Sequence, residues 1–498
     1  EDNNQFEYLQ LERKESFQKL ITQFDQSVHQ KATLSPYYQD ILRDYQKEGY
    51  QWLRTIHDCG FNGILADDMG LGKTLQVIAL IELLKLKQVS IVICPSSLIY
   101  NWEDEVNKFA PDLKVKCIVG NQSIRQNIIN EVQNYRLVIT SYDYMRRDYQ
   151  LYQQVEFGYI ILDESQYIKN QKTKNAQSVK ELKGLHKLAL SGTPIENSLA
   201  ELWSVFDFLM PQYLFNYHYF KKQYESKIVK DHDEEAIKQL RKLVSPFILR
   251  RNKKDVLLEL PDKIEKTQII PFTSKESELY FANLAQVNQE LQALFQTEAV
   301  DKIQILAMLT KLRQICCEPR MIYENIDEVS SKMKACLELI NSYKMNNQKV
   351  LLFSTFTKVF DLFEEEFYLN GITYFKLTGT TSKEKRKEYV DRFQNNEVDV
   401  FLISLKAGGT GLNLTQAEAV IHFDPWWNLS AQNQATDRAY RIGQHKNVQV
   451  HKLIMKDSIE EKIQKLQNKK KELADMFVEN NEGNITSLSK DELMELFS

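Results

Sequence analysis

A glycine-rich stretch early in the chain has the residue types that bind phosphate. The letters "DDMGLGKT" begin at Asp67 and contain Gly70, Gly72, Lys73 and Thr74. In a phosphate-binding loop, backbone N–H groups surround the phosphates, the lysine reaches the terminal ones, and the Ser or Thr hydroxyl holds Mg²⁺. Asp67 occupies the place of the first glycine in the usual GxxxxGK[ST] pattern. The stretch therefore predicts a nucleotide site that departs from the pattern at one position.

Two carboxylates, those of Asp67 and Asp68, stand at the entrance of this loop. Facing a triphosphate at about 4 Å in a partly buried site, each would cost several kcal/mol through charge repulsion. We therefore expect both to point away from the phosphates. They would instead accept hydrogen bonds from loop amides, or pair with a basic residue from the second half of the chain when the cleft closes.

A second acidic pair follows a later apolar run. "IILDES" ends in Asp163, Glu164 and Ser165, and the carboxyl edge of an open α/β sheet is where ligands bind. There Asp163, together with Thr74, would orient Mg²⁺, and Glu164 would polarise the attacking water. The alternative is an exposed acidic turn, but the order of the two motifs along the chain favours a nucleotide hydrolase.

The elements that must position these residues are short apolar runs separated by amphipathic stretches, a pattern typical of buried parallel strands in α/β units. They predict two doubly wound sheets, one in each half of the chain. In the first half the expected strands are 63–66, 90–95, 137–141, 159–164 and 187–192, and in the second half they are 349–354, 373–379, 399–404, 419–424 and 448–454.

Between the two sheets, residues 201–335 lack the strand pattern and show helical spacing of apolar residues. A further amphipathic stretch, 458–477, predicts a helix that packs on a surface. The expected domains are a 1–36 N-terminal arm of unknown role, a 37–200 ATP-binding lobe, its 201–264 helical insertion, the 265–335 helical insertion of the second lobe, the 336–456 second lobe, and 457–498 C-terminal helices.

Composition limits the class of protein. The chain has 498 residues, a formal net charge of −4 and 43% hydrophobic residues, which fits an intracellular multidomain protein without a membrane span. The six cysteines form no CxxC pair, so we expect reduced, mostly buried thiols and no zinc site. A slightly acidic total does not exclude nucleic acid, because binding depends on where Lys and Arg cluster. Since the first residue is Glu1, we expect a piece of a longer protein.

Several longer motifs make the chain recognisable. It resembles the SWI/SNF-type ATPases of helicase superfamily two from about residue 37 onward, in a form that leans towards bacterial members. The stretches that carry the resemblance are "LRDYQKEGYQWL" (42–53), "DDMGLGKT" (67–74), "ICPSSLIYNWEDE" (93–105), "DESQYIKN" (163–170), "LSGTPIENSLAELWSVFDFLMP" (190–211), "LTGTTSKEKR" (377–386) and "SLKAGGTGLNLTQAEAVIHFDPWWNLSAQNQATDRAYRIGQ" (404–444).

The resemblance implies an α/β fold of two tandem RecA-like P-loop NTPase lobes with helical insertions. It also implies ATP and Mg²⁺ as cofactors, and a monomer that moves along double-stranded DNA without separating the strands and displaces DNA-bound protein. The location would be the bacterial cytoplasm, on the nucleoid, or the nucleus in a eukaryote. Residues matching the family's catalytic positions are Lys73, Asp163, Glu164, Arg438 and Arg441, and those matching nucleotide-binding positions are Gln46, Asp68, Gly70, Leu71, Gly72, Lys73, Thr74 and Gly411.

Three of these matches have simpler alternatives. Gln46 matches the glutamine that recognises adenine, or is a surface glutamine on a helix. Arg438 and Arg441 match two arginines that approach the γ-phosphate from the second lobe, or are solvent-exposed helix residues. A guanidinium supplied across a cleft neutralises transition-state charge, so the first alternative agrees with the chemistry.

The chain departs from many family members at Gln166, where they have His. As in DEAQ-like members, we expect Gln166 to couple the acidic motif to Ser191 and Thr193 through hydrogen bonds. The departure leaves the detail of this coupling open and does not touch hydrolysis.

Movement on duplex of any sequence requires contacts mainly to phosphate. Trp426 and Trp427 are either a stacking wedge or core residues. A basic run, 248–256, is either a solvated face or a track for phosphates. By motif match the expected DNA-binding residues are Ser96, Trp102, Thr140, Ser141, Ser354, Thr378, Lys406, Gly408, Thr410, Asn413 and Trp427.

Two other functions stay open at this point. One is a strand-separating helicase or an RNA-stimulated ATPase of the same superfamily. The other is a nucleotide-gated scaffold that binds DNA or protein and switches without repeated turnover.

Overall fold

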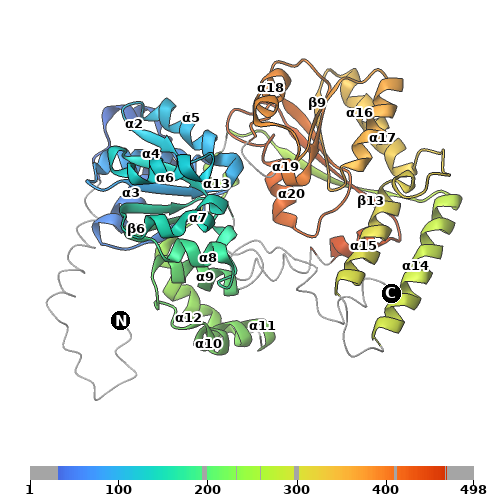
Figure 1. Ribbon diagram of the computed structural model, residues 1–498. Coiled ribbons are helices and arrows are strands. Elements are labelled where there is room, and N and C mark those ends of the chain that lie inside the picture. The colour runs from blue at the N-terminus through green and yellow to red at the C-terminus, as the bar shows by residue number, and fades with distance from the viewer. Residues whose placement is uncertain are drawn as a thin grey trace. The chain divides into compact units, whose positions relative to one another are not determined.

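The computed structural model describes residues 32–192, 199–231, 233–257, 259–295, 302–408, 412–465 and 467. The chain forms two units, each with its own sheet (Figure 1). The first consists of Glu1–Asp67, Gly72–Gly192 and Trp203–Arg251, and the second of Asp68–Leu71, Thr193–Leu202 and Asn252–Ser498. The predicted N-terminal arm lies almost entirely outside the described residues.

The first unit is built on a parallel sheet of seven strands in the order β3-β4-β2-β5-β6-β1-β7. All five strands expected in the first half of the chain are present. Two short strands, β3 and β7, were not predicted, because two or three residues carry too little pattern. The bounds are β1 (Gly63–Leu65), β2 (Ser90–Cys94), β3 (Val115–Cys117), β4 (Leu137–Ser141), β5 (Glu156–Leu162), β6 (Lys183–Leu190) and β7 (Ile248–Leu249).

Both faces of this sheet are covered. Val92 packs in a core cluster with residues of α3, α4 and α5, while the neighbouring Ile91 and Ile93, which point to the opposite face, are also fully buried. Continuous burial is the reason these strands appear as uninterrupted apolar runs. The main helices around the sheet are α2 (Pro36–Ile41), α3 (Asp44–Asp58), α4 (Lys73–Leu84), α5 (Ile99–Phe109), α6 (Gln122–Asn130), α7 (Tyr142–Asp148), α8 (Lys174–Lys180) and α9 (Leu199–Leu209).

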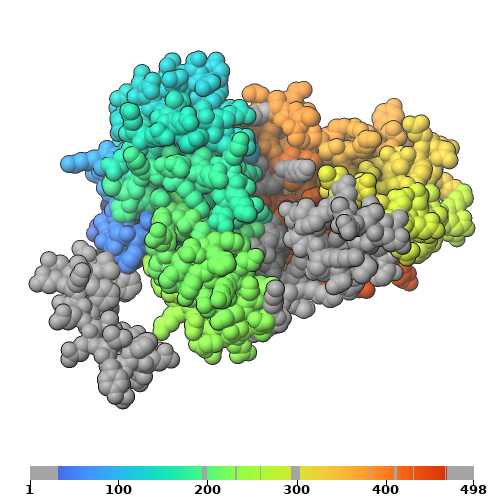
Figure 2. All heavy atoms as spheres, turned by 60° about the horizontal axis from the view of Figure 1, so that its bottom comes forward, coloured from blue at the N-terminus to red at the C-terminus, as the bar shows by residue number. Residues whose placement is uncertain are grey.

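A smaller helical part of the first unit projects beyond its sheet, drawn in light green in Figures 1 and 2. It contains α10 (Tyr217–Phe220), α11 (Ser226–Asp231) and α12 (Glu234–Val244). Asp233 caps α12 by accepting hydrogen bonds from two of its first N–H groups. The helical insertion predicted after residue 200 is therefore present.

The second unit contains a six-stranded parallel sheet in the order β10-β11-β9-β12-β13-β8. All five strands expected in this half are present. The expectation that 201–335 holds no strand was wrong, since β8 pairs with β13 over its whole length at the sheet's edge. Most residues of β8 are exposed, and charged or polar residues interrupt the apolar ones, so it has no long apolar run to detect. The bounds are β8 (Lys263–Ile270), β9 (Lys349–Ser354), β10 (Tyr374–Leu377), β11 (Val400–Ser404), β12 (Ala417–His422) and β13 (Val448–Met455).

Alternate residues of β9 separate two cores in this unit. Leu352 packs in a cluster with α14 to α17, and Phe353 packs in a second cluster with residues of α18 and α20. Residues 459–465, the start of the predicted C-terminal helix, are helical, and most of the rest lies outside the described residues. The helices are α13 (Lys253–Val256), α14 (Ser274–Phe295), α15 (Lys302–Cys317), α16 (Ser331–Met345), α17 (Lys358–Leu369), α18 (Lys383–Gln394), α19 (Leu405–Gly408) and α20 (Leu429–Thr436).

All six cysteines are buried and free, as expected. Among the residues that the structure describes, no helix has the length and apolar character needed to cross a membrane.

Histidines held in their neutral form make stability depend on pH. Burial, followed by repulsion from His186, lowers the pKa of His57 from 6.5 to about 4, and burial lowers the pKa of His422 to about 3. Below pH 6.5 the unfolded chain takes up protons that these folded histidines do not, so stability is lost as the pH falls from 6.5 towards 4. We expect a loss of about 1 kcal/mol per histidine between pH 7.5 and 5.5, measured by urea unfolding. His57→Phe should lose less than the unchanged protein, and an equal loss would contradict this origin.

Candidate functional site

The glycine-rich loop joins β1 to α4, as a phosphate-binding loop requires. Gly70 and Gly72 have φ angles of +82° and +75°, in the left-handed region that favours glycine. Gly72 is the N-cap of the 12-residue α4, and the N–H groups of the first turn of a helix have no acceptor within the helix, so they are suited to bind an anion. Lys73 follows at once, and its Nζ donates to the backbone oxygen of Asp67 at 2.5 Å. The loop thus has the backbone geometry and the cation that hold phosphate.

The two entrance aspartates bind protein groups. Asp67 is fully buried, and both of its carboxylate oxygens accept from Arg251, with Nε to Oδ1 at 2.8 Å. Asp68 Oδ2 accepts from the backbone N–H of Lys253, the first residue of α13, at 3.0 Å. The alternative was a basic partner from the second lobe. It was wrong for Asp67, because Arg251 is the last residue of the first unit.

Gln46 lies against the glycine-rich loop. It is buried on α3, and its Oε1 accepts from the N–H of Arg43 at 3.0 Å. A Cβ built on Gly72 would overlap the Nε2 of Gln46. The alternative of a surface glutamine is therefore wrong, and recognition of adenine stays a prediction.

The acidic pair follows β5 at the carboxyl edge of the first sheet. Asp163 accepts a hydrogen bond from Trp102 Nε1 at 2.8 Å. Burial, and then the neighbouring charge of Glu164, raise the pKa of Asp163 to about 7, against the opposing effects of Trp102 and Lys73. Glu164 has φ +51°, a conformation that costs a non-glycine residue energy and is found at functional sites.

Gln166 connects the acidic pair to the end of β6. Its Nε2 donates to Glu164 Oε2 at 2.8 Å, and its Oε1 accepts from Ser191 Oγ at 3.4 Å. This geometry suits the coupling role proposed for Gln166 and Ser191. Thr193, the third residue of that group, lies outside the described residues.

In the second unit the two arginines of the last motif donate to backbone oxygens of Gly408 and Leu412. Arg438 is buried and its Nε donates to the oxygen of Gly408 at 3.1 Å. Arg441 is partly exposed, and its Nη1 donates to the oxygen of Leu412 at 3.3 Å. The alternative of two solvent-exposed helix arginines is wrong for Arg438.

Comparison with known proteins identifies the family. Residues 45–321 match the model of the SNF2-related domain, and residues 331–443 match the helicase conserved C-terminal domain. The chain belongs to the SNF2-related family. The resemblance inferred from the motifs is thereby confirmed, and so is the pair of RecA-like α/β domains.

Individual relatives of this SNF2-related chain come from several organisms. It is 41% identical to "Putative ATP-dependent helicase/translocase YwqA" of Bacillus subtilis over 93% of this chain and 52% of the relative. It is 35% identical to "SWI/SNF-related matrix-associated actin-dependent regulator of chromatin subfamily A member 1" of Mus musculus over 85% of this chain and 42% of the relative. A solved structure, "Sulfolobus solfataricus SWI2/SNF2 ATPase core in complex with dsDNA", is 36% identical, covers 94% of this chain and 97% of that one, and has a TM-score of 0.44. The chain spans about half the length of the curated relatives.

Three residues of the first unit of the SNF2-related chain that were expected to contact DNA have buried side chains bonded within the protein. Trp102 is buried and gives its only N–H donor to Asp163, so it supports the acidic pair. Thr140 is buried on β4, with its hydroxyl directed at the oxygen of Ile118 at 3.4 Å. Ser141 is buried and its Oγ caps α7 by accepting from the N–H of Tyr144.

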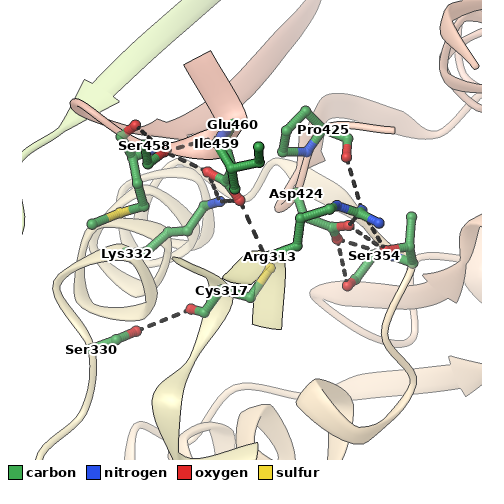
Figure 3. Close-up of polar contacts among 12 residues, drawn as sticks. Arg313, Cys317, Ser330, Lys332, Ser354, Asp424, Pro425, Ser458, Ile459 and Glu460 are labelled. Atoms are coloured by element: carbon green, nitrogen blue, oxygen red, sulfur yellow. Dashed lines mark hydrogen bonds and ion pairs between the residues drawn. The ribbon is translucent and has the colours of Figure 1, made fainter. Parts of the chain in front are cut away.

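Three residues of the second unit that were expected to contact DNA are also buried. Ser354 is buried and donates to Asp424 Oδ1 at 2.7 Å (Figure 3). Gly408 is buried, and a Cβ there would lie 2.6 Å from the Phe353 ring, so its glycine serves packing. Trp427 is a core residue with 8% exposure. Motif matching found these residues but not the direction in which their side chains point.

The remaining DNA candidates differ in what can be said of them. Ser96 and Asn413 are exposed, and Thr378 is partly exposed, so all three can reach a ligand. Thr410 and the nucleotide candidate Gly411 lie outside the described residues, as does the side chain of Lys406.

The basic residues of the run at 248–256 do not share one exposed surface. Arg251 is used by Asp67, and Lys253 is 4% exposed with its Nζ 2.7 Å from Asp437 Oδ1. In this run Lys254 is the basic residue that is exposed. The sequence of the run alone does not show which of its basic residues pair with acidic residues.

Arg313 is a residue that the sequence analysis missed. From α15 its Nη2 donates to Thr355 Oγ1, Asp424 Oδ2 and Pro425 O at 3.1, 2.9 and 3.0 Å (Figure 3). It thereby fixes the loops after β9 and β12 at the carboxyl edge of the second sheet. A single arginine inside an otherwise apolar helix pattern was the available signal.

Proposed function

We propose that the protein is an ATP-dependent translocase on double-stranded DNA, which hydrolyses ATP between its two RecA-like lobes. In this proposal it remodels or displaces DNA-bound protein without separating the strands. One observation carries the proposal: in a chain of the SNF2-related family, the glycine-rich loop after β1 and the Asp163–Glu164 pair after β5 lie at the carboxyl edge of the same parallel sheet. The names of the relatives, an ATP-dependent helicase/translocase and a chromatin regulator, support both the activity and the nucleic acid.

The residues of the glycine-rich loop and of the acidic motif divide the work of hydrolysis. Lys73 and the N–H groups at the start of α4 would hold the phosphates, with Gly70, Leu71 and Gly72 supplying the loop backbone. Glu164 would accept a hydrogen bond from the attacking water and direct it in line with the γ-phosphate. Gln166, bonded to both Glu164 and Ser191, would hold that carboxylate in place.

The acidic pair fits Mg²⁺. Burial, and then the charge of the neighbouring Glu164, raise the pKa of Asp163 to about 7, so a bound cation would favour the charged form of this carboxyl. Asp163 and the Thr74 hydroxyl would hold the ion. Mg²⁺ neutralises the charge that develops on the phosphates.

The second unit supplies positive charge. Arg438 and Arg441 would meet the γ-phosphate when the lobes close, and such arginines contribute about 10³ or more in rate. Phosphate contacts from both units would alternate during the cycle, with Ser96 on the first and Thr378 and Asn413 on the second. The bacterial relatives support a place on the nucleoid.

Activator specificity tests this proposal against its alternatives. ATP turnover of the whole chain should rise at least tenfold with blunt double-stranded DNA, more than with single-stranded DNA or RNA, because phosphate contacts on duplex drive the cycle. Triplex displacement should require ATP, while strand displacement from the same duplex stays at background.

Other outcomes overturn it. Strand displacement would indicate a helicase, and stronger activation by RNA an RNA-stimulated ATPase. Binding of ATP without repeated turnover would indicate a nucleotide-gated scaffold.

A further inference from the structure

Arg251 is the centre of a buried cluster beside the glycine-rich loop. Its guanidinium donates to both oxygens of Asp67, to Gln76 Oε1 at 2.9 Å and to the backbone oxygen of Tyr45. Gln76, from α4, also donates to Asp67 Oδ2 at 3.2 Å. Arg251 therefore ties α3 and α4 to Asp67, the residue that leads into the glycine-rich loop.

The cluster begins where two strands end side by side. β1 leads into the loop and pairs with β7, with Leu65 opposite Leu249. The N–H of Ala66 then donates to the oxygen of Leu249 at 2.7 Å. Asp67 and Arg251 each lie two residues beyond Leu65 and Leu249, so their ion pair continues the strand register past the strand ends. It holds the segment that enters the loop against the segment that leaves the first unit.

Lys253, two residues later, is anchored in the second unit. Its side chain is buried, with Nζ 2.7 Å from both Asp437 Oδ1 and the backbone oxygen of Tyr440. Each of these two residues immediately precedes an arginine of the last motif, Arg438 or Arg441. The contact fixes the backbone that carries them.

A buried ion pair of this kind is not retained for stability alone. Removing both charges is often neutral or stabilising, whereas removing one partner leaves a buried charge without compensation. Asp67 replaces the glycine of the common loop pattern and is fully buried. Because Arg251 must reach this buried carboxylate, the position of Asp67 determines where residues 251–253 lie.

We propose that Arg251 and Lys253 are positioning residues of the ATPase: Arg251 sets the path of the phosphate loop, and Lys253 sets the segment carrying Arg438 and Arg441. A change at the loop on binding nucleotide then passes through three consecutive residues to the arginine segment. This inference rests on the proposed ATPase function.

Gly49 offers a way to disturb the cluster without altering its charges. A Cβ on Gly49 would overlap Gln76 Oε1 and lie 2.6 Å from Arg251 Nη2. In a helix Gly→Ala ordinarily stabilises by up to about 1 kcal/mol, so Gly49→Ala should fold while displacing the guanidinium. We expect Gly49→Ala and Arg251→Lys to raise the KM for ATP about tenfold with little change in kcat, since they alter the loop before nucleotide binds.

Lys253→Met should show the opposite pattern. The loop is intact, so the KM for ATP stays within about twofold, while kcat falls at least tenfold because the arginine segment is no longer fixed. Lys254→Gln, an exposed basic neighbour, is the matched control and should change neither constant in the absence of DNA. Thermal unfolding of each variant checks that it is folded.

Hydrogen exchange measures whether a change at the loop reaches the segment that carries Arg438 and Arg441. Hydrogen exchange of peptides covering 437–441 should respond to ADP in the unchanged protein and lose that response in Arg251→Lys at saturating ADP. If a folded Arg251→Lys or Gly49→Ala keeps both the KM and the exchange response, the inference fails. If the unchanged protein itself does not hydrolyse ATP, the proposed function fails instead, and the two outcomes are distinct.

Discussion

Glu164→Gln is expected to lower DNA-stimulated ATP turnover by at least about a hundredfold while nucleotide and DNA binding are retained. The substitution keeps the shape of the side chain and removes the charge that polarises water. Gln166 Nε2 can still donate to the new amide oxygen in place of Glu164 Oε2, so the local hydrogen bond survives. Phosphate release under saturating ATP and DNA is the measurement, with fluorescence binding of each ligand beside it.

A matched control lies on the same strand. Glu156 is the exposed first residue of β5, at the end of the strand opposite the acidic pair. Glu156→Gln removes the same charge and should leave turnover unchanged. Lys73→Ala should also abolish turnover, because it removes the cation of the loop. Turnover of Glu164→Gln within twofold of the unchanged protein would show that Glu164 has no part in the chemistry.

Lys332→Met is expected to destabilise the second unit by about 3–5 kcal/mol. Lys332 and Glu460 are both fully buried, and Lys332 Nζ lies 2.7 Å from each oxygen of Glu460 (Figure 3). Burial raises the pKa of Glu460, and the Lys332 ammonium opposes that effect. Without Lys332 the carboxylate is left charged in an apolar core or must take up a proton. Urea unfolding at pH 7.5 measures the loss.

A double substitution and an exposed pair complete this test. Lys332→Met combined with Glu460→Leu should recover most of the lost stability, since no uncompensated charge remains. Lys275 and Glu328 form an exposed ion pair at the same 2.7 Å separation, and Lys275→Met should barely change unfolding. If Lys332→Met and Lys275→Met unfold alike, burial does not control the strength of the Lys332–Glu460 pair.

The strands that the sequence predicted are those whose side chains are buried on both faces. β2 and β11 are uninterrupted runs of buried residues, so the apolar pattern alone located them. β8 was missed because its edge position leaves charged side chains in water, and β7 because two residues carry no pattern. The pattern of apolar residues indicates burial, so it does not reveal strands at the edge of a sheet.

The nucleotide residues were predicted for a different reason. The spacing of Gly70, Gly72, Lys73 and Thr74 is local, and a loop between strand and helix is set by neighbouring residues. The DNA-contact residues stay predictions, because a motif match does not determine which way a side chain points. Trp102 and Ser354 belong to matching motifs, yet each bonds a buried carboxylate, Asp163 or Asp424.

The amino-acid sequence by itself determined the family, the two parallel sheets and the residues of the phosphate loop, since each depends on patterns within a few neighbouring residues. Only the tertiary structure decided what the entrance aspartates do. Asp67 finds its partner 184 residues away, at Arg251. That pairing depends on β1 and β7 lying side by side. The free energy that brings such distant residues together comes from the whole core, so neither residue's own position in the sequence reveals it.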